Sequence, residues 1–273
     1  MGSKMTVLLS TYNGVHCLPD LLDSLLAQTR MPDRILVRDD GSTDGTLEIL
    51  AAYRERFPGL TYYAGPNLGA RGSFFNLLLR AAGPEEPSSD IYALCDQDDR
   101  WLPERLARSV SSIETLLAET GEDEATPILA CGRPRLVGPD FEPIKETRRF
   151  ILPHPSFGNA LVENICIGCT AAFSRALLEQ VTAAGVPETA VMHDWWLYLF
   201  AAGCGRVVYD PEPTVLYRQH GGNAIGMSAT SAGHQLGRAR RYLAARGRSL
   251  LAAQTASFLR CFGDRLSGED RLL

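Results

Sequence analysis

Residues 5–99 alternate between short apolar runs and amphipathic segments, and few folds accommodate that pattern. Buried strands are predicted at 7–9, 35–37, 60–64 and 91–95. Between them, apolar residues recur at helical spacing, in segments that begin near Pro19, after Asp44 and before Phe74. Strands that alternate with helices in this way form a mostly parallel sheet with helices on both faces. The fold class predicted is therefore α/β.

The chain after residue 99 is less regular, but nothing in it indicates a second domain. It has an amphipathic segment at 106–117 and short strands separated by prolines. Further helices are predicted at 176–184 and 195–202, and further strands at 207–209 and 215–217. We expect one domain with halves at 5–99 and 100–228, followed by a helical tail at 229–273.

Composition and charge restrict the class of protein further. The 273 residues are 45% hydrophobic with a net charge of −5, which suits a globular protein with a full core. No uncharged apolar run reaches the roughly 20 residues of a membrane span, and residues 5–10 are too short for an export signal, so we expect a cytoplasmic protein. From Ala229 onward the chain contains eight arginines and three acidic residues. The acidic remainder argues against a nucleic-acid-binding protein.

The cysteines indicate a reducing environment. There are seven, an odd number without framework spacing, which favours free thiols. Cys166 and Cys169 form the one close pair, but no second pair lies at ligand spacing, so packing is the preferred interpretation.

Three polar clusters directly follow predicted strands. They are Ser10–Asn13, Asp39–Asp40 and Asp96–Asp99. In an open parallel sheet, ligands bind beyond the carboxyl ends of the strands. Three carboxylates within four residues repel one another unless a cation lies among them, and Mg²⁺ or Mn²⁺ prefers such oxygen ligands. The sequence predicts a metal–phosphate site at this edge.

Two common nucleotide-binding designs are disfavoured. The chain has two lysines, Lys4 and Lys145, and no P-loop. Residues 69–72 do not match the glycine pattern of a dinucleotide-binding turn, and they follow the third strand instead of the first.

Six short motifs, in order along residues 5–226, resemble inverting family-2 glycosyltransferases of the GT-A fold. They are Leu8–Gly14, Val37–Asp44, Asn67–Gly69, Asp96–Asp99 with Trp101–Pro103, Gly168–Thr170 and His193–Trp196. The ending Tyr217–Gly226 is most similar to bacterial members that transfer rhamnose or similar sugars during the synthesis of cell-surface polysaccharides. The resemblance implies a UDP- or dTDP-sugar donor and a hydroxyl of a saccharide or lipid-linked acceptor.

The resemblance also implies roles for donor-binding residues. Ser10, Thr11 and Tyr12 would hold the nucleotide, with Tyr12 against the base. Asp40 would accept a hydrogen bond from N3–H, which uracil and thymine carry and cytosine lacks. Arg71 and Arg218 would contact phosphate, and Asp96 would contact the ribose or the donor sugar.

The remaining implied roles concern the metal and the reaction. Asp98 would ligate Mg²⁺ or Mn²⁺, His220 would reach the metal or the diphosphate, and Asp99 would be a supporting carboxylate. Asp194 would be the general base that deprotonates the acceptor hydroxyl. His193 departs from the family, which more often has an acidic residue before this aspartate.

Alternatives remain open at this point. An Asp-x-Asp after a buried strand also occurs in haloacid-dehalogenase phosphatases, a sugar-nucleotide pyrophosphorylase is a nearer rival, and a non-catalytic sugar-nucleotide-binding protein fits the same spacing. The tail, with Arg238, Arg241 and Arg248 beside leucines and phenylalanines, suits packing on the body, a homodimer, or peripheral contact with the inner face of a membrane.

Overall fold

A seven-stranded sheet organises the protein, in a computed structural model that describes residues 2–144, 153–219 and 245–273. The strand order is β3-β2-β1-β4-β8-β6-β9. The bounds are β1 Met5–Thr11, β2 Arg34–Asp39, β3 Leu60–Ala64, β4 Ile91–Asp96, β6 Ile128–Gly132, β8 Ala172–Ser174 and β9 Arg206–Asp210. All neighbouring pairs are parallel except those of β8, which runs antiparallel to both β4 and β6.

The register of the parallel strands brings the polar clusters together. Ser10 of β1 lies opposite Arg38 of β2 on one side and opposite Asp96 of β4 on the other. Because parallel strands end at the same edge, the turns that follow β1, β2 and β4 are neighbours in space.

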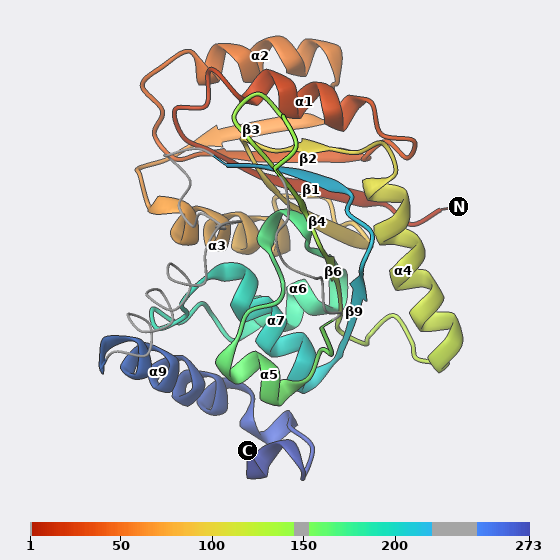
Figure 1. Cartoon of the computed structure of the whole chain (residues 1–273), viewed down its shortest axis with the longest axis vertical. Coiled ribbons are helices and arrows are strands. Elements are labelled where there is room, and N and C mark those ends of the chain that lie inside the picture. The colour runs from red at the N-terminus through yellow and green to blue at the C-terminus, as the bar shows by residue number, and fades with distance from the viewer. Residues whose placement is uncertain (1, 145–152, 220–244) are drawn as a thin grey trace.

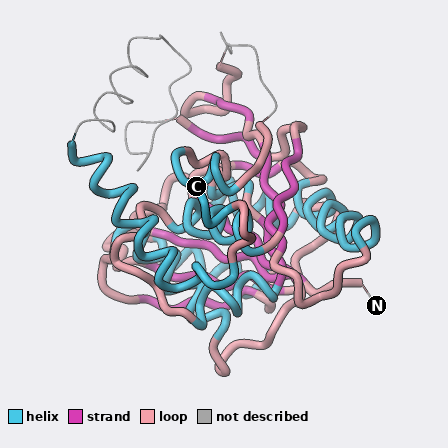
Figure 2. The backbone as a smooth tube through the Cα atoms, turned by 90° about the horizontal axis from the view of Figure 1, so that it is seen from below, coloured by secondary structure: helices cyan, strands magenta, loops and turns pink. Residues whose placement is uncertain are grey.

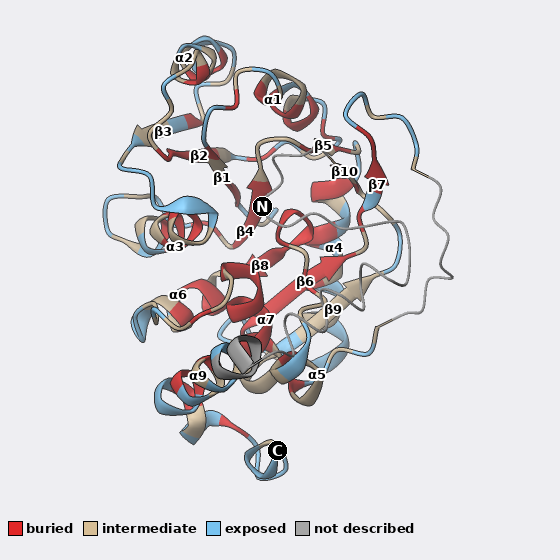
Figure 3. Cartoon of the chain, turned by 60° about the vertical axis from the view of Figure 1, so that its left-hand side comes forward, coloured by how far each residue is buried: buried red, intermediate tan, exposed pale blue. Residues whose placement is uncertain are grey.

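Helices cover both faces of the sheet. One hydrophobic cluster packs α1 (Leu18–Leu26), α2 (Thr46–Arg56) and α4 (Arg105–Thr120) on one face. The other packs α3 (Gly69–Ala82), α5 (Phe157–Val162), α6 (Arg175–Ala183), α7 (His193–Cys204) and α9 (Ala245–Phe262) on the opposite face. Figure 1 shows the two helical layers, and Figure 2 shows the strands between them in a turned view. The strands at the centre are the most buried part of the chain (Figure 3).

A second, three-stranded sheet lies beside the carboxyl edge of the first. Its order is β5-β10-β7, with β5 Arg100–Trp101, β7 Arg135–Val137 and β10 Val215–Arg218. Since β5 follows Asp96–Asp99 directly, this small sheet fixes the C-terminal end of the acidic turn.

Most of the predicted elements are confirmed, and the α/β class with them. β3 has the predicted bounds, and the other predicted strands and helices differ by a few residues at their ends. Among the helices and strands, the short β5, α5 and β8 were not predicted from the sequence. Asp44 does not lie at the N-cap of α2, which is Gly45, although its carboxylate accepts the Thr46 N–H at 3.0 Å.

The predicted tail contains a long helix, α9, whose second half is part of the core. Phe258 is fully buried and Phe262 is nearly so, and both rings contact Trp196 of α7. Phe258 also contacts Phe157 of α5. The packing interpretation of the tail is confirmed for this half. Arg238 and Arg241 lie outside the described residues.

The described helices offer no membrane span, because none combines the length and the apolar character needed to cross a bilayer. The seven cysteines are all unpaired, as predicted, and Cys166 and Cys169 are both fully buried.

The packing of α9 makes a prediction about stability. Phe258→Ala should lower the free energy of unfolding by about 3–5 kcal/mol, because it leaves a cavity among three aromatic rings. The neighbouring Leu259 is 47% exposed, so Leu259→Ala should cost less than about 1 kcal/mol. Denaturant unfolding of both variants measures the difference. Equal costs would contradict an integral role for α9.

Candidate active site

Ser10 and Thr11, at the end of β1, and Tyr12, which follows it, have different surroundings in the structure. The Ser10 hydroxyl lies 2.6 Å from that of Ser73 in α3. The Thr11 hydroxyl is buried and donates to Asp39 at 3.0 Å, so this side chain supports the next turn. Tyr12 is 47% exposed, and Gln97 fixes its backbone by bonding both its N–H and its carbonyl.

The turn after β2 contains two buried aspartates with separate tasks. Asp39 shapes the turn by accepting the N–H groups of Gly41 and Ser42, and Gly41 has a φ of 84°, which glycine adopts without strain. Asp40 instead accepts the N–H groups of Leu68 and Gly69, both at 2.8 Å, at the N-terminus of α3. Asp40 therefore lies at the positive end of a helix dipole.

Both predicted phosphate-contacting arginines already have partners in the protein. Arg71 donates to the carbonyls of Glu188 and Ala190, and so holds the loop that leads into α7. The Arg218 guanidinium donates to Asp20 at 2.7 Å and lies over the Phe141 ring, with 4.0 Å to its centroid.

The acidic turn after β4 is the most highly charged part of this edge. The pKa of Asp96 is raised from 3.8 to about 8, first by burial and then by the nearby carboxylates of Asp98 and Asp194. Burial together with Asp96 and Asp98 also holds the pKa of Asp99 well above its usual value. One Asp99 oxygen accepts the Arg218 backbone N–H at 3.2 Å. The four carboxylates are thus close enough to repel one another.

A cation fits this cluster because it relieves that repulsion. Asp96, Asp99 and the Cys169 thiol each offer a ligand atom, and these atoms all lie within 4.8 Å of one another. Asp98 acts on both neighbouring carboxylates but is not in this closest group. Oxygen donors of this kind suit Mg²⁺ or Mn²⁺. Of the two predicted ligands, Asp98 lies at the cluster, and His220 lies outside the described residues.

Cys169 is the neighbour that the sequence did not indicate. It belongs to a short helical turn between α5 and β8, and only the antiparallel placement of β8 brings it next to Asp99. No local pattern in the sequence connects residues so far apart along the chain.

Asp194 begins α7 and faces the acidic turn from the other side of the edge. Its carboxylate accepts the Gly168 N–H at 3.0 Å and the Trp195 N–H at 2.7 Å. Burial outweighs these bonds and raises its pKa from 3.8 to about 6. A Cβ on Gly168 would stand 3.5 Å from Asp194 Oδ2 and 3.2 Å from His193 Nε2, so glycine permits this close approach. Asp194 is therefore a fixed carboxylate whose pKa lies near neutrality.

His193 is a buried neutral imidazole beside this carboxylate. Its ring stacks on Phe74 with 4.1 Å between centroids, and burial lowers its pKa from 6.5 to about 3. Neither ring nitrogen has a hydrogen-bond partner among the described residues. An imidazole with so low a pKa does not compete with Asp194 for a proton near neutral pH.

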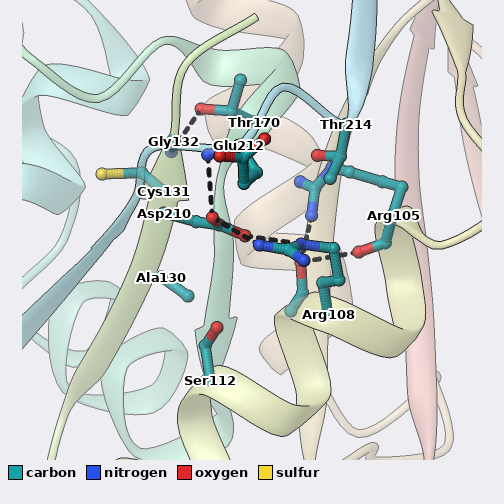
Figure 4. A pocket seen from close by; sticks show the side chains of 11 residues that line it. Arg105, Arg108, Ser112, Ala130, Cys131, Gly132, Thr170, Asp210, Glu212 and Thr214 are labelled. Carbon is teal, nitrogen blue, oxygen red and sulfur yellow. Dashed lines mark hydrogen bonds and ion pairs between the residues drawn. The ribbon is translucent and has the colours of Figure 1, made fainter.

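A separate small polar hollow lies between α4 and the ends of β6 and β9 (Figure 4). Both arginines that line it are engaged: Arg108 forms two bonds to Asp210, and Arg105 donates to Ser109 and to the carbonyls of Cys169 and Ala171. The acidic edge, where titratable groups converge, is the better candidate for chemistry.

Comparison with protein families agrees with this placement. The model named Glycosyl transferase family 2 matches residues 6–182, which include the turns after β1, β2 and β4. The chain belongs to this family.

Relatives and solved structures extend the comparison. The dTDP-rhamnosyl transferase RfbG of Shigella flexneri is 26% identical over 221 residues, which cover 80% of this chain and 73% of the relative. An uncharacterized glycosyltransferase of Nostoc is 28% identical over 240 residues, covering 84% and 68%. An uncharacterized protein of Mycobacterium tuberculosis is 25% identical over 224 residues, covering 79% of this chain but only 59% of its own length.

Two solved structures share the GT-A fold. S. aureus TarS 1-349 in complex with UDP-GlcNAc has a TM-score of 0.56 at 19% identity, covering 98% of this chain and 77% of its own. The mannosyltransferase PcManGT of Pyrobaculum calidifontis, in complex with GDP-Man and Mn²⁺, also has a TM-score of 0.56 at 19% identity, covering 100% and 78%.

The raised pKa of Asp96 predicts how stability depends on pH. A folded-state pKa of about 8, above the ordinary 3.8, means that stability falls as the pH rises from about 4 to 8. Asp96→Asn removes this loss. It should stabilise the metal-free protein by about 1–3 kcal/mol at pH 8, less than the full shift would give because Asp96 is partly exposed, and by little at pH 4.5.

Denaturant unfolding in EDTA at the two pH values measures the effect. Asp140→Asn is the control, because that carboxylate is exposed to solvent. A gain from Asp96→Asn that does not grow with pH would contradict the repulsion described here.

Proposed function

We propose that the protein is an inverting glycosyltransferase that moves a sugar from a UDP- or dTDP-sugar to a hydroxyl of a saccharide or lipid-linked acceptor. The observation that carries the proposal is Asp194, a buried carboxylate with a pKa of about 6 that faces the acidic turn. The similarity to a dTDP-rhamnosyl transferase favours rhamnose as the sugar.

The proposed reaction is a single displacement. Asp194 takes the proton of the acceptor hydroxyl, and the acceptor oxygen attacks the anomeric carbon from the face opposite the nucleotide. The bond from that carbon to the nucleoside diphosphate breaks, and the diphosphate leaves with the electron pair. The product then has the inverted configuration.

The chain's own residues prepare this step. The Gly168 and Trp195 N–H groups hold the Asp194 carboxylate in one orientation. Burial brings its pKa to about 6, so the group is ionised at neutral pH and still basic enough to accept a proton. His193 cannot take over this task, because its pKa is about 3.

A divalent cation would be held by Asp98 with help from Asp96 and Asp99. When bound, Mg²⁺ or Mn²⁺ offsets the negative charge that develops on the departing diphosphate. The carboxylate cluster supports this part of the proposal, because the charge of Asp98 raises the pKa values of both Asp96 and Asp99.

Family membership removes the basis for the phosphatase and pyrophosphorylase alternatives. A non-catalytic sugar-nucleotide-binding protein remains the rival, and the variants below distinguish it. A cytoplasmic location, with peripheral contact to a membrane or a homodimer through the tail, is a further part of the proposal that rests on the sequence of residues 229–273.

Asp194→Asn should leave donor binding intact and lower transfer by about 10²–10⁴-fold, because an amide cannot accept the proton. Transfer by the wild type should rise with pH up to about 6 and then level off. Release of UDP or dTDP from nucleotide-sugars in the presence of a panel of saccharide acceptors measures both. Unchanged turnover in the variant would mean that the base lies elsewhere.

Asp98→Ala should abolish metal-dependent donor binding, because the remaining carboxylates complete the coordination sphere poorly. Calorimetry with UDP or dTDP, with and without Mn²⁺, measures the loss. Asp140→Ala serves as the matched control on an exposed carboxylate. If Asp98→Ala retains both the affinity and the dependence on Mn²⁺, Asp98 is not a ligand.

A further inference from the structure

Arg38 places a positive charge inside the protein, near the end of β2 and directly after three apolar residues. Its side chain is about 2% exposed, and the preceding Ile35, Leu36 and Val37 are fully buried or nearly so. A buried guanidinium destabilises a protein unless its donors and its charge are matched. The partners of Arg38 therefore indicate why the strand tolerates it.

The guanidinium connects three segments. One terminal nitrogen donates to the Asp40 carboxylate and, at 3.0 Å, to the Ser73 hydroxyl of α3. The other donates to the Pro66 carbonyl at 2.9 Å, in the loop between β3 and α3. A single side chain thus holds the turn after β2, this loop and the first turns of α3 in one arrangement.

The same network reaches the loop after β1. The hydroxyls of Ser73 and Ser10 lie 2.6 Å apart, and Ser73 is fully buried. Ser10 and Asp40 are both among the residues that the resemblance to family-2 glycosyltransferases assigns to the nucleotide. Arg38 contacts Asp40 directly and is connected to Ser10 through the Ser73 hydroxyl.

Arg38 also determines how many acceptor positions of the Asp40 carboxylate remain for a ligand. Asp40 Oδ1 accepts from Arg38 and from the Leu68 N–H, and Oδ2 accepts from the Gly69 N–H. An ionised carboxylate has about four acceptor positions. Among the described residues, nothing donates to the one remaining position, on Oδ2, and this position suits the single N3–H of uracil or thymine. The bare N3 of cytosine is an acceptor and finds no donor there.

We propose that Arg38 is a positioning residue that sets nucleobase selectivity, by holding the Asp40 carboxylate in the orientation that leaves one acceptor position free. The inference rests on the proposed function and adds a residue that does not itself touch the base. Without Arg38, Asp40 Oδ1 loses one of its two donors, so the carboxylate is no longer held in one orientation toward the base. Selection against cytosine then weakens.

The test compares UDP, dTDP and CDP by calorimetry on the full chain with Mn²⁺. The wild type should bind UDP or dTDP about 10–100-fold more tightly than CDP, the value of one hydrogen bond to a charged group. Arg38→Met should reduce this ratio to about threefold or less, mainly through weaker binding of UDP and dTDP.

Arg34→Met is the matched control. Arg34 is in the same strand, at the end away from the site, and it also forms an ion pair, to Glu86 at 2.7 Å. This variant loses an ion pair and should keep the wild-type ratio. If selectivity changes only in the Arg38 variant, the change reflects recognition of the base and not a general loss of stability.

Loss of Arg38 leaves Asp40 buried without its counter-charge, so a second variant guards against misfolding. Arg38→Met/Asp40→Asn removes both charges, and its amide offers a donor and an acceptor, so UDP and CDP should bind about equally. The wild-type ratio in either variant overturns the inference, as does equal binding of UDP and CDP by the wild type. A wild type that binds no nucleoside diphosphate overturns the proposed function itself.

Discussion

Mutual repulsion among buried carboxylates is the constraint on which this site depends. Parallel strands deliver the acidic turn after β4 to one edge of the sheet, and the antiparallel β8 leads the chain back so that Gly168 and Asp194 stand opposite it. Burial together with neighbouring carboxylates brings the pKa of Asp96 to about 8, and burial alone brings that of Asp194 to about 6. Crowded carboxylates lower the stability of a fold, and groups with strongly shifted pKa values gather at functional sites. We therefore interpret the cluster as a site for a cation and a proton transfer.

Contacts far from the acidic turn hold Asp194 in place. The loop before α7 is fixed by Arg71 of α3, through the carbonyls of Glu188 and Ala190. It is also fixed by α9, whose Gln254 accepts the Val191 N–H at 2.8 Å and whose Ser257 lies 2.7 Å from the Thr189 hydroxyl. The C-terminal helix α9 therefore supports the proposed base as well as the core. In the structure Arg71 holds this loop, whereas the family resemblance implied that it contacts phosphate.

The first four strands could be predicted closely because each is a short apolar run bounded by local signals. The three residues of β8 carry no such signal, since their position depends on pairing with β4 and β6, distant in sequence. The same limit applies within the site. The aspartates were found because they follow strands directly, whereas Cys169 beside Asp99 and Gly168 beside Asp194 depend on tertiary contacts. In the sequence, Arg38 stands out as a charged residue directly after an apolar run, but only the structure reveals its partners.

The central claim is that the carboxylates at this edge hold a cation against the donor diphosphate, with Asp194 across from it. Anomalous diffraction at the manganese edge, from crystals grown with dTDP and Mn²⁺, tests it most directly. The account predicts a manganese peak that bridges Asp98 and the diphosphate, with Asp194 free of metal. A peak elsewhere in the protein, or dTDP bound away from the ends of β1, β2 and β4, would contradict it.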